Sequence, residues 1–263
     1  MVVALKARYS QAFADQGYPK WSFEVPPAIP FVGDQFGSAP KRVLVYASAE
    51  NLNHKDQVVE LLNLPDPMLR SGCFLASRRI HDPNSTFVHI NPIDNRGLLL
   101  AARHALHRLD PQWAFAIDNP ASFLDEIAVA NLGKFSIDPD KINALRKRNY
   151  DYANDPAKFE EMRRYILADL DVLTPDIIIV PKTIARTLRR LDPPIDLAQG
   201  RSIVEVYQVS PQAINCHIKR QITNTNWDST DLSYANWLVT DGRLKMNLYL
   251  QWLDRLPDLQ KSS

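Results

Sequence analysis

The chain has 263 residues, of which 45% are hydrophobic and 23% are charged, and its 31 basic residues nearly balance its 30 acidic ones. These fractions are typical of a folded globular protein and exclude a disordered, collagen-like or coiled-coil chain. Because the net charge is only +1, the overall field of the protein does not by itself draw it to nucleic acid.

Glycine and cysteine usage excludes several cofactor sites. The 8 glycines lie too far apart to form the glycine-rich fingerprint of dinucleotide-binding proteins or a phosphate-binding P-loop. The two cysteines, Cys73 and Cys216, form no C-x-x-C pair, so a zinc or iron–sulfur site is not expected. We predict no cofactor and no metal cluster, and we expect two buried thiols rather than a disulfide.

The N-terminus does not have the pattern of a secretory signal, because Lys6 and Arg8 follow its short apolar patch at once. The longest purely apolar stretches, 98–102 and 177–180, are far shorter than a membrane span. We therefore expect a cytoplasmic protein that is monomeric and has no membrane partner.

The first 41 residues are predicted to form a helix and an extended connector. Residues 1–15 have helical periodicity and are followed by Gly17 and Pro19, which end helices. The proline-rich segment 18–40 mixes aromatic residues with prolines and is expected to pack as an ordered extended segment. We predict one domain over residues 1–263, with 1–41 as an N-terminal extension and 229–263 as a C-terminal helical extension.

Short apolar runs predict strands, and amphipathic runs between them predict helices. The predicted strands are 42–47, 87–90, 126–130, 176–180 and 202–207. The predicted helices after the first are 56–63, 95–109, 141–150, 156–173, 183–191 and one within 233–256. This alternation indicates an α/β protein with three layers, α/β/α, around a mostly parallel central sheet.

In such a fold, ligands bind beyond the carboxyl ends of the strands. The residues that follow the predicted strands are therefore the first candidates for a functional site. They are residues 48–53, 91–95, 131–134, 181–183 and 208–215.

Five segments at these strand ends and on a nearby helix resemble, in order, the motifs of the uracil-DNA glycosylase superfamily. They are VLVYASAENLN at 43–53, IDNRGLLLAARHAL at 93–106, FLDEIAVANLGKF at 123–135, TPDIIIVPKTIARTL at 174–188 and VEVYQVSPQAINCHIKR at 204–220. The resemblance spans most of the chain. It implies a glycosylase-like fold and an enzyme that flips a base out of DNA and hydrolyses its N-glycosidic bond.

The resemblance also implies which residues bind the base. Asn131 and Lys134 match the motif I-T-N-x-V-K-C, in which the asparagine reads the Watson–Crick edge of the flipped base. An amide carries both a donor and an acceptor, which suits one edge of uracil or thymine. Ser48 and Ser210 fall in the first and last motifs, and we expect both to contact the substrate.

The expected catalytic residues depart from the family pattern. The family's water-activating residue falls on Ser48 or Ala49, and Gln208 replaces the histidine that stabilises the departing base. Glu50 and Asn51 come one and two residues later, so we predict that they orient the water. The alternatives for Glu50 are a cap of the following helix or a simply solvated side chain.

The last motif continues into a segment that resembles the family's DNA-inserting loop. Here Ile214 is predicted to act as an apolar wedge, with Lys219 and Arg220 contacting DNA behind it. A core-facing isoleucine with solvated cations is the alternative. His217 is a candidate donor to the departing base, and a phosphate contact or an ordinary surface position is the alternative for it.

Three functions remain open at this point. The first is a glycosylase-like hydrolase whose partner is DNA rather than RNA. The second is a catalytically inactive protein that binds a nucleobase or nucleic acid on the same fold, because both standard catalytic side chains are missing. The third, a hydrolase with Ser48 as nucleophile, is disfavoured because the sequence around Ser48, with Ala-Ser-Ala at its centre, lacks the glycines of a G-x-S-x-G nucleophile elbow.

Overall fold

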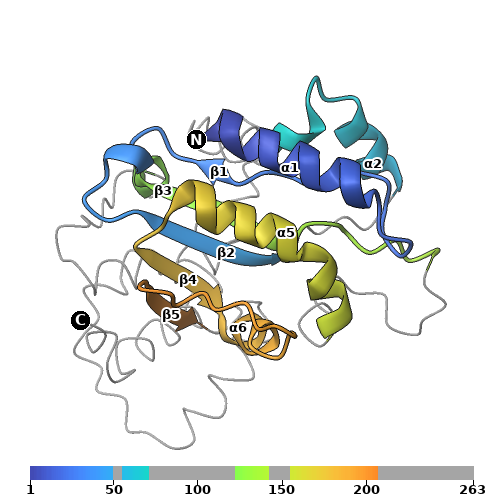
Figure 1. Ribbon diagram of the computed structural model, residues 1–263. Helices are drawn as coiled ribbons and strands as arrows, with labels where there is room; N and C mark the ends of the chain where they lie inside the picture. The colour runs from blue at the N-terminus through green and yellow to red at the C-terminus, as the bar shows by residue number, and fades with distance from the viewer. Residues whose placement is uncertain (50–54, 71–121, 142–154, 207–263) are drawn as a thin grey trace, which may run out of the picture. The chain divides into compact units, whose positions relative to one another are not determined.

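The computed structural model describes residues 1–49, 55–70, 122–141 and 155–206, and its centre is a five-stranded sheet with the order β1-β3-β2-β4-β5 (Figure 1). The strands are β1 (Phe31–Val32), β2 (Val43–Ala49), β3 (Ile127–Gly133), β4 (Ile177–Pro181) and β5 (Ser202–Val206). Strand β2 pairs in parallel with both β3 and β4, whereas β1 is antiparallel to β3. The prediction of an α/β protein with a mostly parallel sheet is confirmed.

Two central strands are longer than the sequence predicts. The ladder between β2 and β3 continues to the pair Ala49 and Gly133, so both strands extend past the predicted ends at Ala47 and Ala130. Each further pair of residues adds inter-strand hydrogen bonds, and the buried Leu132 continues the alternation of the strand. Asn131 therefore lies within a strand and not in the loop that follows it.

The described helices are α1 (Val2–Gln16), α2 (Lys55–Leu62), α5 (Pro156–Leu173) and α6 (Lys182–Leu188), with short 3-10 turns η1 (Phe36–Ser38), η2 (Pro67–Leu69) and η4 (Ser122–Glu126). The bounds of α5 agree with the prediction because both ends carry strong local signals. Its N-cap is Asp155, whose side chain accepts from the Lys158 N–H, and Pro156 occupies the first turn. Thr174 ends the helix in the left-handed conformation at φ 43.

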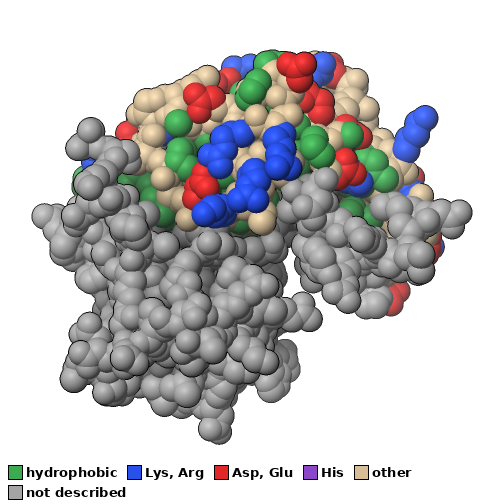
Figure 2. Space-filling view, turned by 90° about the horizontal axis from the view of Figure 1, so that it is seen from below, with side chains coloured by type: hydrophobic (Ala, Val, Ile, Leu, Met, Phe, Trp, Pro, Cys, Tyr) green, Lys and Arg blue, Asp and Glu red, His purple; other side chains and the backbone are tan. Residues whose placement is uncertain are grey.

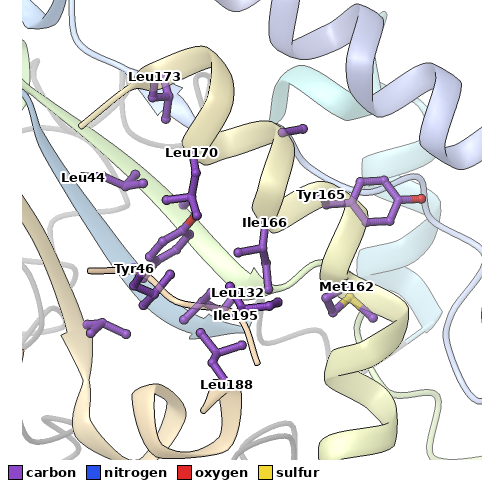
Figure 3. Packing of buried hydrophobic residues seen from close by; sticks show 14 of the residues in the cluster. Leu44, Tyr46, Leu132, Met162, Tyr165, Ile166, Leu170, Leu173, Leu188 and Ile195 are labelled. Atoms are coloured by element: carbon purple, nitrogen blue, oxygen red, sulfur yellow. The ribbon is translucent and has the colours of Figure 1, made fainter. Parts of the chain in front are cut away.

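One face of the sheet packs against α5, and the main core lies there (Figure 3). Leu44 and Tyr46 of β2 face α5, as Leu132 of β3 does, and the helix contributes Ile166 and Leu170. Helix α1 packs along α5, and α6 packs against both α5 and β4. The alternation of strand side chains directs the residues between these to the opposite face.

The proline-rich connector is ordered, as predicted. Phe31 in β1 pairs with Val129 of β3, and the Phe23 N–H donates to the Ser136 carbonyl at 3.0 Å. Phe36 is fully buried in the main core. Prolines cannot propagate a helix, so the segment runs extended along the sheet and buries its aromatic residues there.

The described residues fall almost entirely within one compact unit, made of Met1–Ile80 and Leu124–Glu205. The second unit, His81–Phe123 with Val206–Ser263, lies almost wholly outside them, so the single domain over 1–263 stays a prediction. The predicted strand 87–90 and the predicted helices at 95–109, within 141–150 and within 233–256 also lie outside the described residues. In the part that is described, no helix has the length and apolar character needed to cross a membrane.

Candidate functional site at the carboxyl edge of the sheet

The order of the strands marks one place on the carboxyl edge of the sheet. From β2 the chain goes to β3 on one side, and from β4 it goes to β5 on the other side. The direction of the connections therefore reverses between β2 and β4. In open α/β sheets, ligands bind in the crevice at such a reversal, outside the carboxyl ends of the strands.

Asn131 lies close to this place. It is the third residue from the end of β3 and is paired in parallel register with Ala47 of β2. Asn131 is half-buried, whereas its neighbours Ala130 and Leu132 are buried. Since Tyr46 and Leu132 face α5, the alternation places Asn131 and Ala47 on the opposite face of the sheet, away from the main core.

Ser48 belongs to β2 and follows Ala47, so the backbone brings Ser48 and Asn131 to the same end of two adjacent strands. These two are the only predicted site residues that fall within the described ranges. The others lie outside them, and their roles stay predictions: Glu50, Asn51, Gln208, Ser210, Ile214, His217, Lys219 and Arg220.

A buried ionic cluster lies on the other face of the same strand ends. The Lys134 ammonium, one residue past β3, is 2.7 Å from the Asp169 Oδ2 of α5, and neither side chain has any exposed surface. The phenol of Tyr9 in α1 donates to Asp169 Oδ1 at 2.6 Å, and that of Tyr46 in β2 donates to Oδ2 at 3.1 Å. The Lys134 ammonium also lies 5.4 Å from the centre of the Tyr9 ring.

Burial governs the protonation of this cluster. Burial raises the pKa of Asp169, and the Lys134 ammonium and the two phenols oppose that rise. Burial likewise lowers the pKa of Lys134, and the Asp169 carboxylate opposes the fall. The pKa values of Tyr9 and Tyr46 are raised well above their ordinary value by burial and by the adjacent carboxylate. Both phenols therefore stay protonated and donate to Asp169.

The cluster connects the two strands that carry the candidate site. Tyr46 is two residues before Ser48, and Lys134 is three residues after Asn131. Both side chains converge on one carboxylate of α5, so the ends of β2 and β3 are tied to each other and to the helix. The four side chains of the cluster have no exposed surface, so the cluster braces these strand ends from within the core.

The motif around Asn131 includes Lys134 but does not predict its buried partner, Asp169. A signal for Asp169 was present in the sequence. It interrupts the apolar stripe of α5, between Ile166 on one side and Leu170 and Leu173 on the other. A carboxylate in that position must be paired if it is buried. The sequence does not show which of the 31 basic residues pairs with it.

The described residues contain no group of three or more His, Cys, Asp or Glu side chains that could hold a metal ion. Comparison with known proteins adds no assignment: no protein-family model matches the sequence, and no curated protein matches it significantly.

Proposed function

We propose that the protein binds a nucleobase at the carboxyl edge of β2 and β3 and hydrolyses its N-glycosidic bond in DNA. The observation that supports this most directly is the parallel register that pairs Asn131 with Ala47, next to Ser48. It brings together the ends of the two strands that carry the first and third motifs of the glycosylase resemblance. The reversal of the connections between β2 and β4 also supports the proposal, because ligands of open α/β sheets bind at such a place.

Hydrolysis of an N-glycosidic bond needs a base held out of the stack, an oriented water and a donor to the departing base. In this proposal the Asn131 amide provides both a donor and an acceptor to one edge of a pyrimidine. Glu50 and Asn51, which continue the chain from β2, orient the water. Gln208 and His217 are the candidate donors to the departing base.

The test uses oligonucleotides that contain uracil, hypoxanthine or xanthine, as single strands and as duplexes. Base release is measured by alkaline cleavage of the abasic product. We expect the parent protein to release at least one of these bases and Asn131→Asp to lose most of that activity, because a carboxylate repels a pyrimidine carbonyl where the amide donated. Asn63→Asp, the same change at an exposed position after α2, is the matched control and should keep the activity of the parent.

Two outcomes would overturn parts of the proposal. If the folded parent protein releases no base, the proposed hydrolase activity is wrong. Base-specific binding without release would then favour the catalytically inactive binding protein. Equal activity of Asn131→Asp and the parent would show that Asn131 does not read the base.

A further inference from the structure

Helix α6 begins immediately after β4 and has one strongly basic face. Ile184, Ala185 and Leu188 are buried in the main core, which fixes the orientation of the helix. Thr183 and Arg186, which are exposed, point the other way. The chain therefore presents a cationic surface directly next to the carboxyl edge of the sheet.

The basic residues of this face repeat at helical spacing. Lys182, Arg186 and Arg190 are four residues apart, and we call these three the α6 basic stripe. Arg190 lies in a turn that continues from the end of α6, in which the Arg189 N–H donates to the Ala185 carbonyl at 3.2 Å and the Arg190 N–H donates to the Thr187 carbonyl at 2.9 Å. Residues four apart lie on one side of a helix, about 6 Å from each other along its axis.

The stripe is a local feature of a nearly neutral protein. Figure 1 places α6 on the lower side of the described sheet, and Figure 2, seen from below, shows Lys and Arg side chains gathered on that side. Arg189 extends the basic face and forms an ion pair with Glu205 at 2.6 Å. With a net charge of only +1 for the whole chain, such a concentration of cations favours a partner with closely spaced negative charges.

We propose that the α6 basic stripe holds the phosphodiester backbone of DNA. The proposal rests on the proposed function for the choice of DNA and goes beyond it by assigning the surface. One DNA strand carries a phosphate about every 3.4 Å along the axis, so three cations spread over about 12 Å of helix face several phosphates at once. Lys182 follows Pro181, the last residue of β4, so a strand bound along α6 leads to the edge that carries the candidate site.

The experiment measures the affinity of the full-length protein for a short fluorescein-labelled DNA duplex without modified bases. Fluorescence anisotropy is recorded over a series of sodium chloride concentrations. The test variant is Lys182→Gln/Arg186→Gln/Arg190→Gln. The matched control is Arg8→Gln/Lys20→Gln/Lys41→Gln, which removes three exposed cations from parts of the chain outside α6. Both variants have the same net charge, lowered from +1 to −2, so only the position of the lost charges differs.

We expect the stripe variant to bind about tenfold more weakly or worse, and its slope of log K against log salt to be smaller by roughly three, because each phosphate contact contributes about one to that slope. The control should keep nearly the slope of the parent. Arg186→Gln alone, at an exposed helix position, should give about one third of the change in slope, which provides a test if the triple variant does not fold.

Equal weakening in the stripe variant and the control would overturn the proposal, since net charge and not the stripe would then set the affinity. So would an unchanged slope in the stripe variant. Binding to vesicles of anionic phospholipid without any binding to the DNA duplex would also overturn it, in favour of a membrane surface.

Two separate measurements test the two proposals: the affinity for the unmodified duplex tests the α6 basic stripe, and base release tests the proposed function. If the stripe variant keeps its affinity while Asn131→Asp loses base release, the site assignment holds and the surface is wrong. If the stripe variant loses affinity while no base is released by the parent, the surface holds and the hydrolase is wrong.

Discussion

The Asp169 carboxylate accepts hydrogen bonds from three donors in three different segments of the chain: Tyr9 of α1, Tyr46 of β2 and Lys134 directly after β3. Removing two charges from water costs several kcal/mol for each ion, and the attraction between them offsets this only if the remaining hydrogen-bonding positions are filled. The two phenols fill them. The cluster is therefore balanced as a unit, and the loss of one member leaves the others uncompensated.

We predict that Asp169→Asn destabilises the protein by about 3 to 5 kcal/mol, because it leaves the Lys134 ammonium buried without a counter-charge. The free energy of unfolding is measured by urea denaturation. Asp171→Asn changes an exposed carboxylate on the same helix and should alter stability by less than about 0.5 kcal/mol.

A second measurement tests whether the loss comes from the unpaired charge. Adding Lys134→Met, Tyr9→Phe and Tyr46→Phe to an Asp169→Leu variant should recover most of the stability, because an apolar set of similar volume no longer buries an ion. A loss below about 1 kcal/mol for Asp169→Asn would contradict the buried ion pair.

At this scale the sequence predicts positions better than partners. The motif around Asn131 identified a residue that lies at the carboxyl edge of the sheet, beside β2, the strand that contains Ser48. The apolar run predicted that the strand ends at Ala130 and that Asn131 lies in the following loop, because a polar residue after an apolar run is typical of a strand end. The structure keeps it in β3, since pairing with β2 continues to Gly133. Asp169 and Lys134 are 35 residues apart, and only the packing of α5 on the sheet brings them together.

Among the elements, β2 and β4 are joined at their amino ends by one pair of residues. The Asp176 Oδ2 accepts from the Arg42 N–H at 2.8 Å, and the Arg42 carbonyl accepts from the Asp176 N–H at 2.8 Å. The Asp176 carbonyl also accepts from the Ser202 N–H at 2.9 Å, at the start of β5. One residue thus sets the start of three adjacent strands.

This junction makes stability depend on pH in the acid range. Burial alone would raise the pKa of Asp176, but the hydrogen bonds and charge of Arg42 outweigh it and hold the pKa below its ordinary value. The unfolded chain then binds a proton more readily than the folded one. The stabilisation is therefore fully present above the ordinary pKa of about 4 and is lost as the pH falls through the lower, folded pKa.

We predict that Asp176→Asn lowers the free energy of unfolding by about 1 kcal/mol at neutral pH, a modest value because the side chain is partly exposed. The difference from the parent should stay constant down to about pH 5 and shrink below about pH 4. Urea denaturation over this pH range measures it, with Asp171→Asn as the control. A difference that grows as the pH falls would have the wrong sign for a lowered pKa.

The elements also show what the pattern of a sequence can and cannot predict. The bounds of α5 follow from a capping aspartate, a proline in the first turn and apolar periodicity, all of them local signals. Strand β1 has only two residues, and it is a strand because Phe31 and Val32 pair with β3, almost one hundred positions later in the chain. No local signal distinguishes it from the rest of the proline-rich connector.

On the scale of the described unit, the first helix packs onto elements that are distant in sequence. Leu5 and Tyr9 of α1 have no exposed surface and belong to the main core. The Tyr9 ring packs edge-on against Tyr165 of α5, with 5.1 Å between ring centres. The N-terminal residues therefore complete the core between α5 and the sheet.

Leu5→Ala tests whether α1 is needed for the stability of the whole unit. Alanine is a better helix former than leucine, so helix propensity cannot account for a loss of stability, and any loss measures the packing of α1 on the core. We predict a destabilisation of about 2 to 5 kcal/mol, the usual cost of truncating a fully buried leucine. Val3→Ala, in the same helix at a position that is 83% exposed, should change stability by less than about 0.5 kcal/mol. Both values come from urea denaturation followed by far-UV circular dichroism, with β-sheet and helix signals monitored together. Equal, small effects of the two substitutions would mean that α1 is not packed on α5 in solution, and Asp169 would then lack the hydrogen bond from Tyr9.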